Sequence, residues 1–224
     1  MKIAAFFKIS LLTLVFIFHS QTTHAQISEN VDYRATDNER ITKKINDAFI
    51  KLEALQGLSL AIYSQKNGGY VSSFGVTDIL TREKVNGDTA FYIASSTKSM
   101  FALLFAIAHE QGKIDLDQSI QDFAPDAPFP DSINAQQITL RHLLNMSSGI
   151  KNPSYVHRVA YSGEHDQTLL WELIRETQPN QNKNIRLGHF RYTNWNYNLL
   201  ARLLEHNTNK PWQQTLQEEL FDKF

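Results

Sequence analysis

Apolar and polar positions alternate in ways that divide the chain into a helix, a hairpin and then further helices. From Asp37 to Leu55, apolar residues recur every three or four positions, which predicts a helix that Asp37 caps and Gly57 ends. The stretches 58–64 and 70–76 alternate with a period of two, which is typical of strands. The sequence therefore predicts a helix followed by two antiparallel strands.

The residues around the two predicted strands have turn chemistry. Lys66-Asn67-Gly68-Gly69 separates the strands, and 77–89 forms a polar loop with a turn at Asn86-Gly87-Asp88. A helix and a hairpin must bury their apolar faces together, and a two-stranded hairpin is marginal alone. No third strong strand pattern follows Ser95, so the predicted sheet is small.

The remainder of the chain has helical periodicity interrupted by loops. A helix from Ser95 should stop at Gly112, because glycine is a favourable residue just after a helix. Pro211 should lie in the first turn of a last helix, where its missing N–H costs nothing. The predicted segments are 95–111, a short amphipathic piece at 115–123, 138–146, 168–177, a helix from 196 and 212–224.

The first 25 residues have the composition of a secretory signal peptide. Lys2 and Lys8 give a basic start, 9–18 is a short apolar core, and Thr23-His24-Ala25 is a small-x-Ala cleavage site. The core is too short for a membrane span, although an uncleaved anchor is the alternative. We therefore expect a secreted or periplasmic protein without a stable membrane anchor.

The composition of the chain without this segment excludes some classes of function. The loss of Lys2 and Lys8 leaves 20 basic against 23 acidic residues, a net charge of −3. Nucleic-acid binding would need clustered Lys and Arg, so no nucleic-acid partner is expected. The sequence has no cysteine, which excludes disulfides and a lipoprotein anchor, so a packed core must stabilise the protein.

The segment Phe91-Tyr92-Ile93-Ala94-Ser95-Ser96-Thr97-Lys98 contains the first candidate for chemistry. If Ser95 opens a helix, Lys98 lies one turn on and on the same face. A partly desolvated lysine can act as a base toward a serine hydroxyl. Ser95 is therefore a candidate nucleophile with Lys98 as its activator. The alternative is a chance match in which Ser95 is a plain N-cap.

Tyr192-Thr193-Asn194 is the second candidate. A nearby ammonium lowers the pKa of a tyrosine from its ordinary value of about 10, which makes it a usable base. Asn194 offers donors and acceptors to Lys98 or to a substrate amide. The alternative is an ordinary turn before a helix, with Asn194 as its N-cap.

Together, four ordered blocks resemble the β-lactamase-related serine hydrolases, a family that includes class C β-lactamases, penicillin-binding-protein-like peptidases, esterases and amide hydrolases. The resemblance covers most of the chain after the signal segment. The blocks are Phe91–Lys98, Gly112-Lys113-Ile114-Asp115-Leu116-Asp117, the block from Ile138 to Ile150 that contains Leu140-Arg141-His142-Leu143-Leu144 and Ser148-Gly149, and Phe190-Arg191-Tyr192-Thr193-Asn194 followed by Tyr197, Leu199 and Leu200.

The resemblance implies a fold and a set of roles. The fold would be α+β and β-lactamase/transpeptidase-like, with an antiparallel sheet, flanking helices and a mostly helical subdomain. The domain would cover 37–224, with the sheet region at 37–94 and the helical region at 95–224. Ser95 would be the acylated nucleophile and Lys98 its partner, and Tyr192 would be the general base. Asn194 would orient Lys98 and the substrate, and the Ser95 N–H would be one oxyanion donor. Whether Lys98 or Tyr192 takes the proton stays open.

One family feature is missing from its expected place. A Lys/His-x-Gly strand should follow the Tyr-x-Asn block and supply the second oxyanion donor. Lys66-Asn67-Gly68 has the right letters, but it precedes the nucleophile and suits a hairpin turn. We therefore expect the sequence to lack C-terminal sheet strands. Either the sequence is incomplete or the gene product truncated, or a second chain supplies the strands, or the protein is a degenerate relative of the family.

The sequence therefore predicts an exported serine hydrolase that acts through an acyl-enzyme on an ester, amide or β-lactam-like substrate, small molecule or peptide. The alternative is a catalytically impaired relative that binds cell-wall peptides or a partner protein. No cofactor and no metal are expected, because His142, His157, His165 and His189 lack ligand spacing. His142 is expected to be structural, Trp195 to belong to the core, and Ser147 and Ser148 to form a turn.

Overall fold

The computed structural model describes residues 33–52, 55–65, 68–153, 156 and 167–223. These residues form two compact units that divide between Phe91 and Tyr92. We call them the helix–hairpin unit (33–91) and the helical unit (92–223). The predicted signal peptide and part of the predicted hairpin turn lie outside the described residues. Within the described residues, no helix is both long and apolar enough to cross a membrane.

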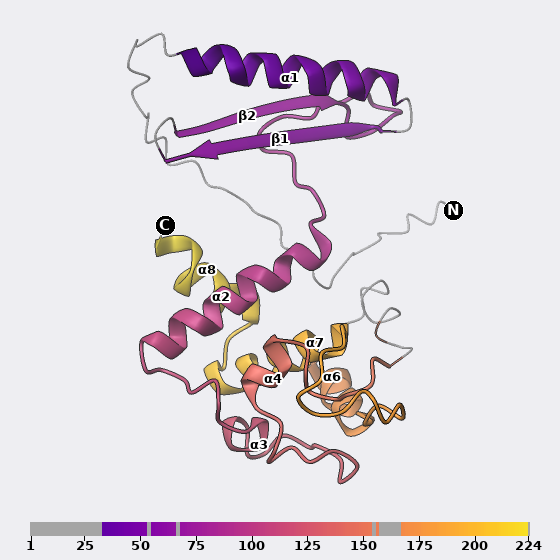
Figure 1. The fold of residues 1–224 in the computed structure, drawn as a ribbon, viewed down its shortest axis with the longest axis vertical. Coiled ribbons are helices and arrows are strands. Elements are labelled where there is room, and N and C mark those ends of the chain that lie inside the picture. The colour runs from indigo at the N-terminus through magenta and orange to yellow at the C-terminus, as the bar shows by residue number, and fades with distance from the viewer. Residues whose placement is uncertain (1–32, 53–54, 66–67, 154–155, 157–166, 224) are drawn as a thin grey trace, which may run out of the picture. The chain divides into compact units, whose positions relative to one another are not determined.

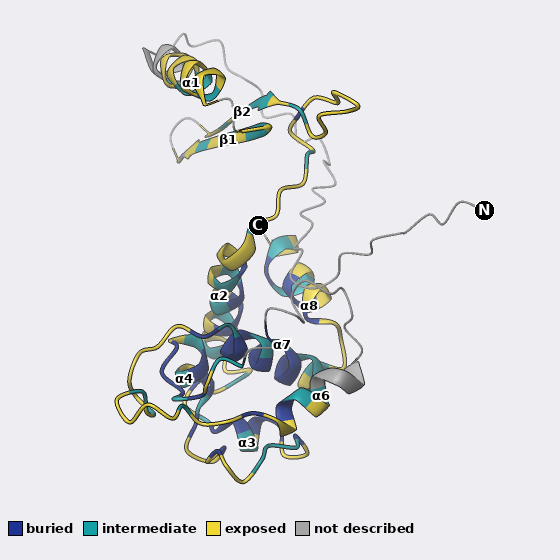
Figure 2. Ribbon diagram, turned by 90° about the vertical axis from the view of Figure 1, so that its right-hand side faces the viewer, coloured by how far each residue is buried: buried dark blue, intermediate teal, exposed yellow. Residues whose placement is uncertain are grey.

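The helix–hairpin unit consists of α1 (Tyr33–Lys51), β1 (Gly57–Ser64) and β2 (Gly68–Gly75). The strands pair antiparallel, with Gly57 opposite Gly75 and Ser64 opposite Gly68. Both ribbon views show α1 lying along one face of the hairpin (Figures 1 and 2). The order of helix and hairpin is the one that the hydrophobic pattern predicts.

Side chains from α1 and β2 connect the two layers of this unit. The Thr42 hydroxyl donates a hydrogen bond of 2.9 Å to the Tyr70 hydroxyl. The rings of Phe49 and Phe74 lie 6.2 Å apart between centroids. Successive side chains of a strand point to opposite faces, so Tyr70 and Phe74, four residues apart on β2, point to the same face. That face is the one that α1 covers.

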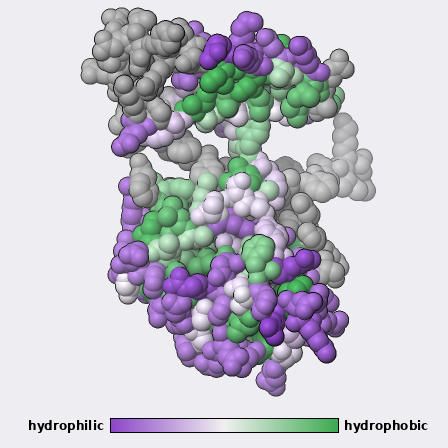
Figure 3. Space-filling model, viewed as in Figure 1, coloured by the Kyte–Doolittle hydropathy of each residue, from purple (hydrophilic) through white to green (hydrophobic). Residues whose placement is uncertain are grey.

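The other strand face and much of α1 remain open to solvent. Tyr63 is 78% exposed and Val71 58% exposed, and Ile50 and Leu52 near the end of α1 are 64% and 55% exposed. Figure 3 shows apolar residues gathered over the hairpin of this unit. Because these apolar side chains stay exposed among the described residues of the unit, they contribute little to its stability.

The boundaries of α1 differ from the sequence prediction. The helix begins at Tyr33 instead of Asp37, because residues 33–36 contain neither glycine nor proline to stop it. It ends at Lys51, and Gly57 is the first residue of β1 instead of the residue that stops the helix. A cap signal such as Asp37 marks a favourable start but does not prevent a helix from extending beyond it.

The helical unit consists of short helices joined by loops (Figure 1). The end of α2 confirms the prediction, because α2 stops two residues before Gly112, whose φ of +68° suits glycine. Pro211 is the N-cap of the last α-helix and not, as predicted, a residue of its first turn. The elements are η1 (Ala94–Ser96), α2 (Thr97–Glu110), α3 (Ile120–Phe123), α4 (Leu140–Leu144), α6 (Gln167–Arg175), α7 (Asn194–Thr208), α8 (Trp212–Glu219) and η2 (Phe221–Lys223).

The core of the helical unit is built around α7. Figure 2 shows that α7 and the neighbouring face of α4 are buried. Leu199, Leu200 and Leu203 of α7 have no exposed surface, and neither do Leu140 and Leu143 of α4. Fully burying a leucine contributes about 1.5–3 kcal/mol, so this interface supplies much of the stability of the unit.

Candidate active site

Ser95, Lys98 and Tyr192 come together in the helical unit. The Ser95 Oγ lies 2.7 Å from the Tyr192 hydroxyl, and the Lys98 Nζ donates a hydrogen bond of 2.9 Å to the same Oγ. Ser95 and Tyr192 are 97 residues apart in the sequence. The serine hydroxyl therefore lies between an amine and a phenol, both within the distance needed for proton transfer.

The backbone before the nucleophile candidate is strained. Ala94 has a φ of +46°, in the left-handed region that non-glycine residues rarely adopt. Ser95 is exposed and lies in η1, and α2 begins only at Thr97, two residues later than predicted. The N-cap of α2 is Ser96, so the interpretation of Ser95 as a plain N-cap is wrong. Strain of this kind concentrates at functional sites.

Packing of α2 fixes the position of Lys98, its second residue. One turn further along α2, the buried Phe101 ring lies 5.7 Å from the Trp212 ring in an edge-to-face arrangement. The same ring lies 6.4 Å from the ring of Tyr197 in α7. These aromatic contacts join α2 to α7 and α8, so the first turn of α2 holds its place relative to the residues that precede α7.

Tyr192 is placed by the residues on both sides of it. The Arg191 N–H donates to the Met146 carbonyl at 2.8 Å, and the Thr193 N–H approaches the Met146 sulfur at 3.5 Å. Thr193 caps α7 by accepting a hydrogen bond from the Trp195 N–H at 3.2 Å. The alternative in which Asn194 caps this helix is therefore wrong. Tyr192 precedes a capped helix start and cannot move independently of it.

The surroundings of Tyr192 make its hydroxyl easier to deprotonate, so that the phenolate, which can accept a proton, is more readily available. Burial raises its pKa, but hydrogen bonds with Ser95 and Lys98 and the positive charge of Lys98 outweigh this and lower the pKa below the ordinary value of 10.0. The residue is 48% exposed. The direction of the shift agrees with the prediction made from the sequence.

Asn194 does not join this hydrogen-bonded group. It is the first residue of α7 and is half-buried. Within the described part of the chain, no hydrogen bond connects it with Ser95, Lys98 or Tyr192. Its expected role toward Lys98 and the substrate stays a prediction.

The structure adds Tyr197, to which sequence reasoning gave no role beyond its place in a family block. The Lys98 Nζ lies 5.4 Å from the centroid of the Tyr192 ring and 5.8 Å from that of the Tyr197 ring. Tyr197 lies on the face of α7 that includes Leu200 and Leu204. That helical spacing marks it as a core residue but does not reveal its distance from Lys98.

Other candidates have structural roles, as predicted. His142 completes a capping box: its Nδ1 accepts a hydrogen bond of 3.1 Å from the Thr139 N–H. The Ser148 hydroxyl donates to the Asn196 side chain at 2.8 Å, and Trp195 is 1% exposed. Among the described residues, no group of three or more His, Asp or Glu side chains could hold a metal ion.

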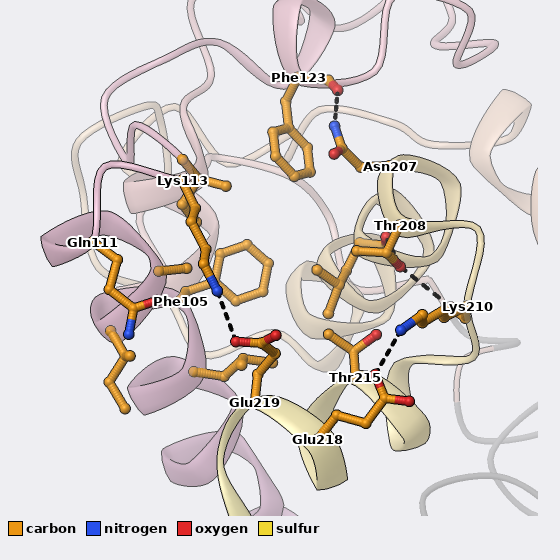
Figure 4. Close-up of a pocket in the computed structure, with 15 residues that line it drawn as sticks. Phe105, Gln111, Lys113, Phe123, Asn207, Thr208, Lys210, Thr215, Glu218 and Glu219 are labelled. Carbon is orange, nitrogen blue, oxygen red and sulfur yellow. Dashed lines mark hydrogen bonds and ion pairs between the residues drawn. The ribbon is translucent and has the colours of Figure 1, made fainter. Parts of the chain in front are cut away.

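A cavity of about 350 Å³ lies elsewhere in the helical unit, where the C-terminal half of α2 meets α7 and α8 (Figure 4). Apolar side chains including Phe105 line it, and two ion pairs stand at its edge. Lys113 pairs with Glu219 at 2.8 Å, and Lys210 with Glu218 at 2.6 Å. Its lining includes none of Ser95, Lys98 and Tyr192, so the candidate active site is separate from this cavity.

Comparison with solved structures shows the fold. A D-amino acid amidase from Ochrobactrum anthropi SV3, solved with D-phenylalanine, matches with a TM-score of 0.67 and 24% identity over 83% of this chain and 50% of its own. An octameric penicillin-binding protein homologue from Pyrococcus abyssi matches with a TM-score of 0.63 and 20% identity over 83% and 42%. The fold is therefore that of the β-lactamase/transpeptidase proteins, as predicted, with a small antiparallel sheet.

Sequence comparison agrees. The penicillin-binding protein PbpX of Bacillus subtilis (strain 168) is 27% identical over 158 residues, which are 70% of this chain and 37% of PbpX. Protein flp of Staphylococcus aureus (strain N315) is 23% identical over 176 residues, 79% of this chain and 35% of flp. The chain thus spans about a third of the length of these relatives. The family model described as Beta-lactamase matches residues 45–224. The chain belongs to the Beta-lactamase family.

Proposed function

We propose that this protein is a serine hydrolase that forms an acyl-enzyme on Ser95 with an ester, amide or β-lactam-like carbonyl. The observation that carries the proposal is the hydrogen-bonded group of Ser95, Lys98 and Tyr192, with both polar partners within 2.9 Å of the serine oxygen. Membership of the Beta-lactamase family supports it. The names of the similar proteins, a D-amino acid amidase and a penicillin-binding protein, favour amide and β-lactam-like substrates.

Before acylation, Tyr192 is a phenolate, and the positive charge of Lys98 stabilises it. The Ser95 oxygen then attacks the substrate carbonyl carbon while the serine proton passes to the phenolate oxygen, and the π electrons of the carbonyl move onto the carbonyl oxygen, which becomes the oxyanion. Collapse of the tetrahedral intermediate expels the amine or alkoxide, which takes the proton held by Tyr192. Water then attacks the acyl-enzyme by the same route in reverse, and the acid product leaves.

The oxyanion of the intermediate needs hydrogen-bond donors. The N–H of Ser95 is one candidate, because N–H groups in the first turn of a helix lack partners within that helix. The family pattern adds a second donor from a Lys/His-x-Gly strand, and no Lys/His-x-Gly follows Asn194 in the sequence. Removal of one oxyanion donor from a serine hydrolase costs about 10²- to 10³-fold in rate. Tests of activity therefore use the protein in the form that its host expresses.

A fluorophosphonate probe tests the proposal directly, because it phosphonylates an activated serine and releases fluoride. The host-expressed protein should label, and mass spectrometry of its peptides should place the adduct on Ser95. Ser95→Ala should lose the adduct, whereas Ser148→Ala, which alters a buried serine in the same unit, should keep a labelled Ser95 if it folds. Equal labelling of wild type and Ser95→Ala would contradict the proposal.

We also propose that the protein is exported, on the basis of the basic start, apolar core and Thr23-His24-Ala25 site near its N-terminus. N-terminal sequencing of protein isolated from its host should find Gln26 as the first residue. Retention of Met1 would contradict cleavage at this site.

A further inference from the structure

A second aromatic ring beside Lys98 has no part in the proton transfer described above. The Tyr192 ring belongs to the proton acceptor itself and lies 5.4 Å from the Lys98 Nζ. The Tyr197 ring lies 5.8 Å from the same nitrogen on a different element, α7. A cation within about 6 Å of a ring centroid is attracted by the negative face of the ring. Lys98 therefore has two aromatic neighbours, and only one of them is reactive.

The Tyr197 ring is held in place on several sides. Its hydroxyl donates a hydrogen bond of 3.0 Å to the Leu144 carbonyl at the end of α4. Its ring lies 6.4 Å from the ring of Phe101, and only 9% of the residue is exposed. The neighbouring Asn196 also donates to α4, through the Leu143 carbonyl at 3.2 Å. Because both residues are anchored to α4, the ring presents a fixed surface to Lys98.

No negative charge of the described residues forms an ion pair with Lys98. Its described neighbours are the Ser95 hydroxyl from η1, the Tyr192 phenol from the segment before α7, and the Tyr197 ring from α7. The titratable groups that face the amine are therefore the two tyrosines. Of these neighbours, the Tyr197 ring takes no part in the proposed proton transfer.

We infer that Tyr197 is a positioning residue for acylation: its ring holds the Lys98 amine in place, so that Lys98 stays in contact with both Ser95 and Tyr192. This inference rests on the proposed function. Lys98 then acts as a fixed positive charge that stabilises the phenolate of Tyr192.

The hydroxyl of Tyr197 does not compete as a base. Burial raises its pKa, and the nearby Tyr192 raises it further. A protonated hydroxyl keeps its hydrogen bond to the Leu144 carbonyl, so the ring stays in place over the pH range in which Tyr192 titrates. The two tyrosines thus have opposite shifts, downward for Tyr192 and upward for Tyr197.

The test compares Tyr197→Phe, which keeps the ring, with Tyr197→Leu, which removes it, in the host-expressed protein. The rate of fluorophosphonate labelling is measured against probe concentration. Tyr197→Leu should lower the maximal labelling rate by about 2- to 30-fold, the range that loss of one cation–π contact implies, with little change in probe affinity. Tyr197→Phe should keep both wild-type values.

Two outcomes would overturn the inference while leaving the proposed function intact. A wild-type labelling rate in Tyr197→Leu would show that the ring is not needed. An equal defect in Tyr197→Phe would show that only the hydroxyl matters. Failure of the wild-type protein to label at Ser95 would instead contradict the proposed function. If Tyr197→Leu does not fold, Tyr197→Met fills the same core space with an unbranched side chain and serves in its place.

A measurement that needs no activity completes the test. Reductive methylation with ¹³C-formaldehyde labels lysine amines, and loss of one signal in Lys98→Arg identifies that of Lys98. Ring currents of Tyr192 and Tyr197 should move this signal upfield of the exposed lysines. The upfield displacement should shrink in Tyr197→Leu and persist in Tyr197→Phe. An unchanged signal in Tyr197→Leu would overturn the inference even if the protein did not label.

Discussion

The two units of this chain differ in how far they bury their apolar side chains. In the helical unit, helices from distant parts of the sequence enclose side chains such as Leu143, Leu199 and Leu203 with no exposed surface. In the helix–hairpin unit, one helix covers one face of two strands, and Val85 is its only described apolar residue that is buried. Leu52 and Val71 remain more than half exposed. A closed core and an open layer thus occur in the same chain.

The difference explains where the candidate chemistry lies. Positions of catalytic groups must be held to within a fraction of an ångström, which needs neighbours that cannot relax. Ser95, Lys98 and Tyr192 all belong to the helical unit, and its closed core fixes η1, α2 and the segment before α7, which present them. The helix–hairpin unit has the two-stranded sheet to which further strands could add, because both strands are edges.

The largest expected effect is that of removing the Tyr192 hydroxyl from the helical unit. Removal of a hydroxyl from the helix–hairpin unit is the control. Tyr192→Phe should slow fluorophosphonate labelling of the host-expressed protein by about 10²- to 10⁴-fold, because it removes the proposed general base. Tyr63→Phe removes a hydroxyl from a residue that is 78% exposed on β1 and should label like wild type. Comparable losses in both variants would break the assignment of chemistry to the helical unit alone.

The next largest effect compares the closed core of the helical unit with the open layer of the helix–hairpin unit. In each, one leucine is replaced by alanine and the change in stability is measured. Leu143→Ala, at a fully buried position of α4, should destabilise the helical unit by about 2–5 kcal/mol. Leu52→Ala, at a position 55% exposed, should leave that unit unchanged. Trp171, Trp195 and Trp212 all lie in the helical unit, so tryptophan fluorescence during urea unfolding reports on that unit. Equal shifts of the urea midpoint would show that the units do not differ in this way.

The sequence predicted the helical unit well where local signals are strong. Gly112 marks the end of α2 because its φ of +68° is easy only for glycine, and Pro211 immediately precedes α8. The Ser95–Lys98 contact follows from residues three apart at a helix start. Signals of this kind act within one or two turns, which is why they can be read from a single sequence.

The sequence alone could not predict contacts that depend on tertiary packing. Periodicity contains nothing that brings Tyr192 to Ser95 across 97 residues, and only the family resemblance suggested it. The left-handed Ala94 carried no signal, because alanine has no preference for that conformation. Tyr197 was visible only as a member of a family block, and its distance from Lys98 depends on how α2 packs against α7. These features come from the closed core.

A smaller effect concerns the capping box of α4 and its dependence on pH. Burial lowers the pKa of His142 below its ordinary value of 6.5, although the charge of Asp117 acts in the opposite direction. The unfolded chain then binds more protons below pH 6.5 than the folded one, so stability should fall as the pH is lowered through that value. Protonation also removes the Nδ1 acceptor of the Thr139 N–H. The expected loss is about 1 kcal/mol, the usual contribution of a helix cap.

His142→Gln is the matched variant for this prediction. Glutamine at this position can form the same reciprocal capping bond but does not titrate. Urea unfolding followed by tryptophan fluorescence should show a loss of stability between about pH 7 and pH 5 in the wild type and a flatter profile in His142→Gln. A variant that kept the full wild-type slope would assign the pH dependence to other groups.

The smallest expected effect lies at the rim of the cavity in the helical unit. Glu219 accepts hydrogen bonds from Lys113 at 2.8 Å and Lys223 at 2.7 Å, and these bonds, that with Lys113 first, lower its pKa from 4.5 to about 2. Because the folded value lies below the unfolded one, the stabilisation is present above about pH 4.5 and is lost as the pH falls toward 2. The carboxylate is 37% exposed, so solvent screening limits its contribution to about 1 kcal/mol or less.

Glu219→Gln should therefore shift the urea midpoint at neutral pH far less than Leu143→Ala does, and 1 M salt should reduce the difference from wild type further. Glu110→Gln, at an exposed position of α2, is the matched control and should have no effect. If Glu219→Gln instead cost as much as Leu143→Ala, the rim ion pairs would hold α8 against α2, and the stability of the helical unit would depend on charge as much as on burial. A small effect would confirm that the packing around α7 dominates, and it is this packing that positions Tyr197 beside Lys98.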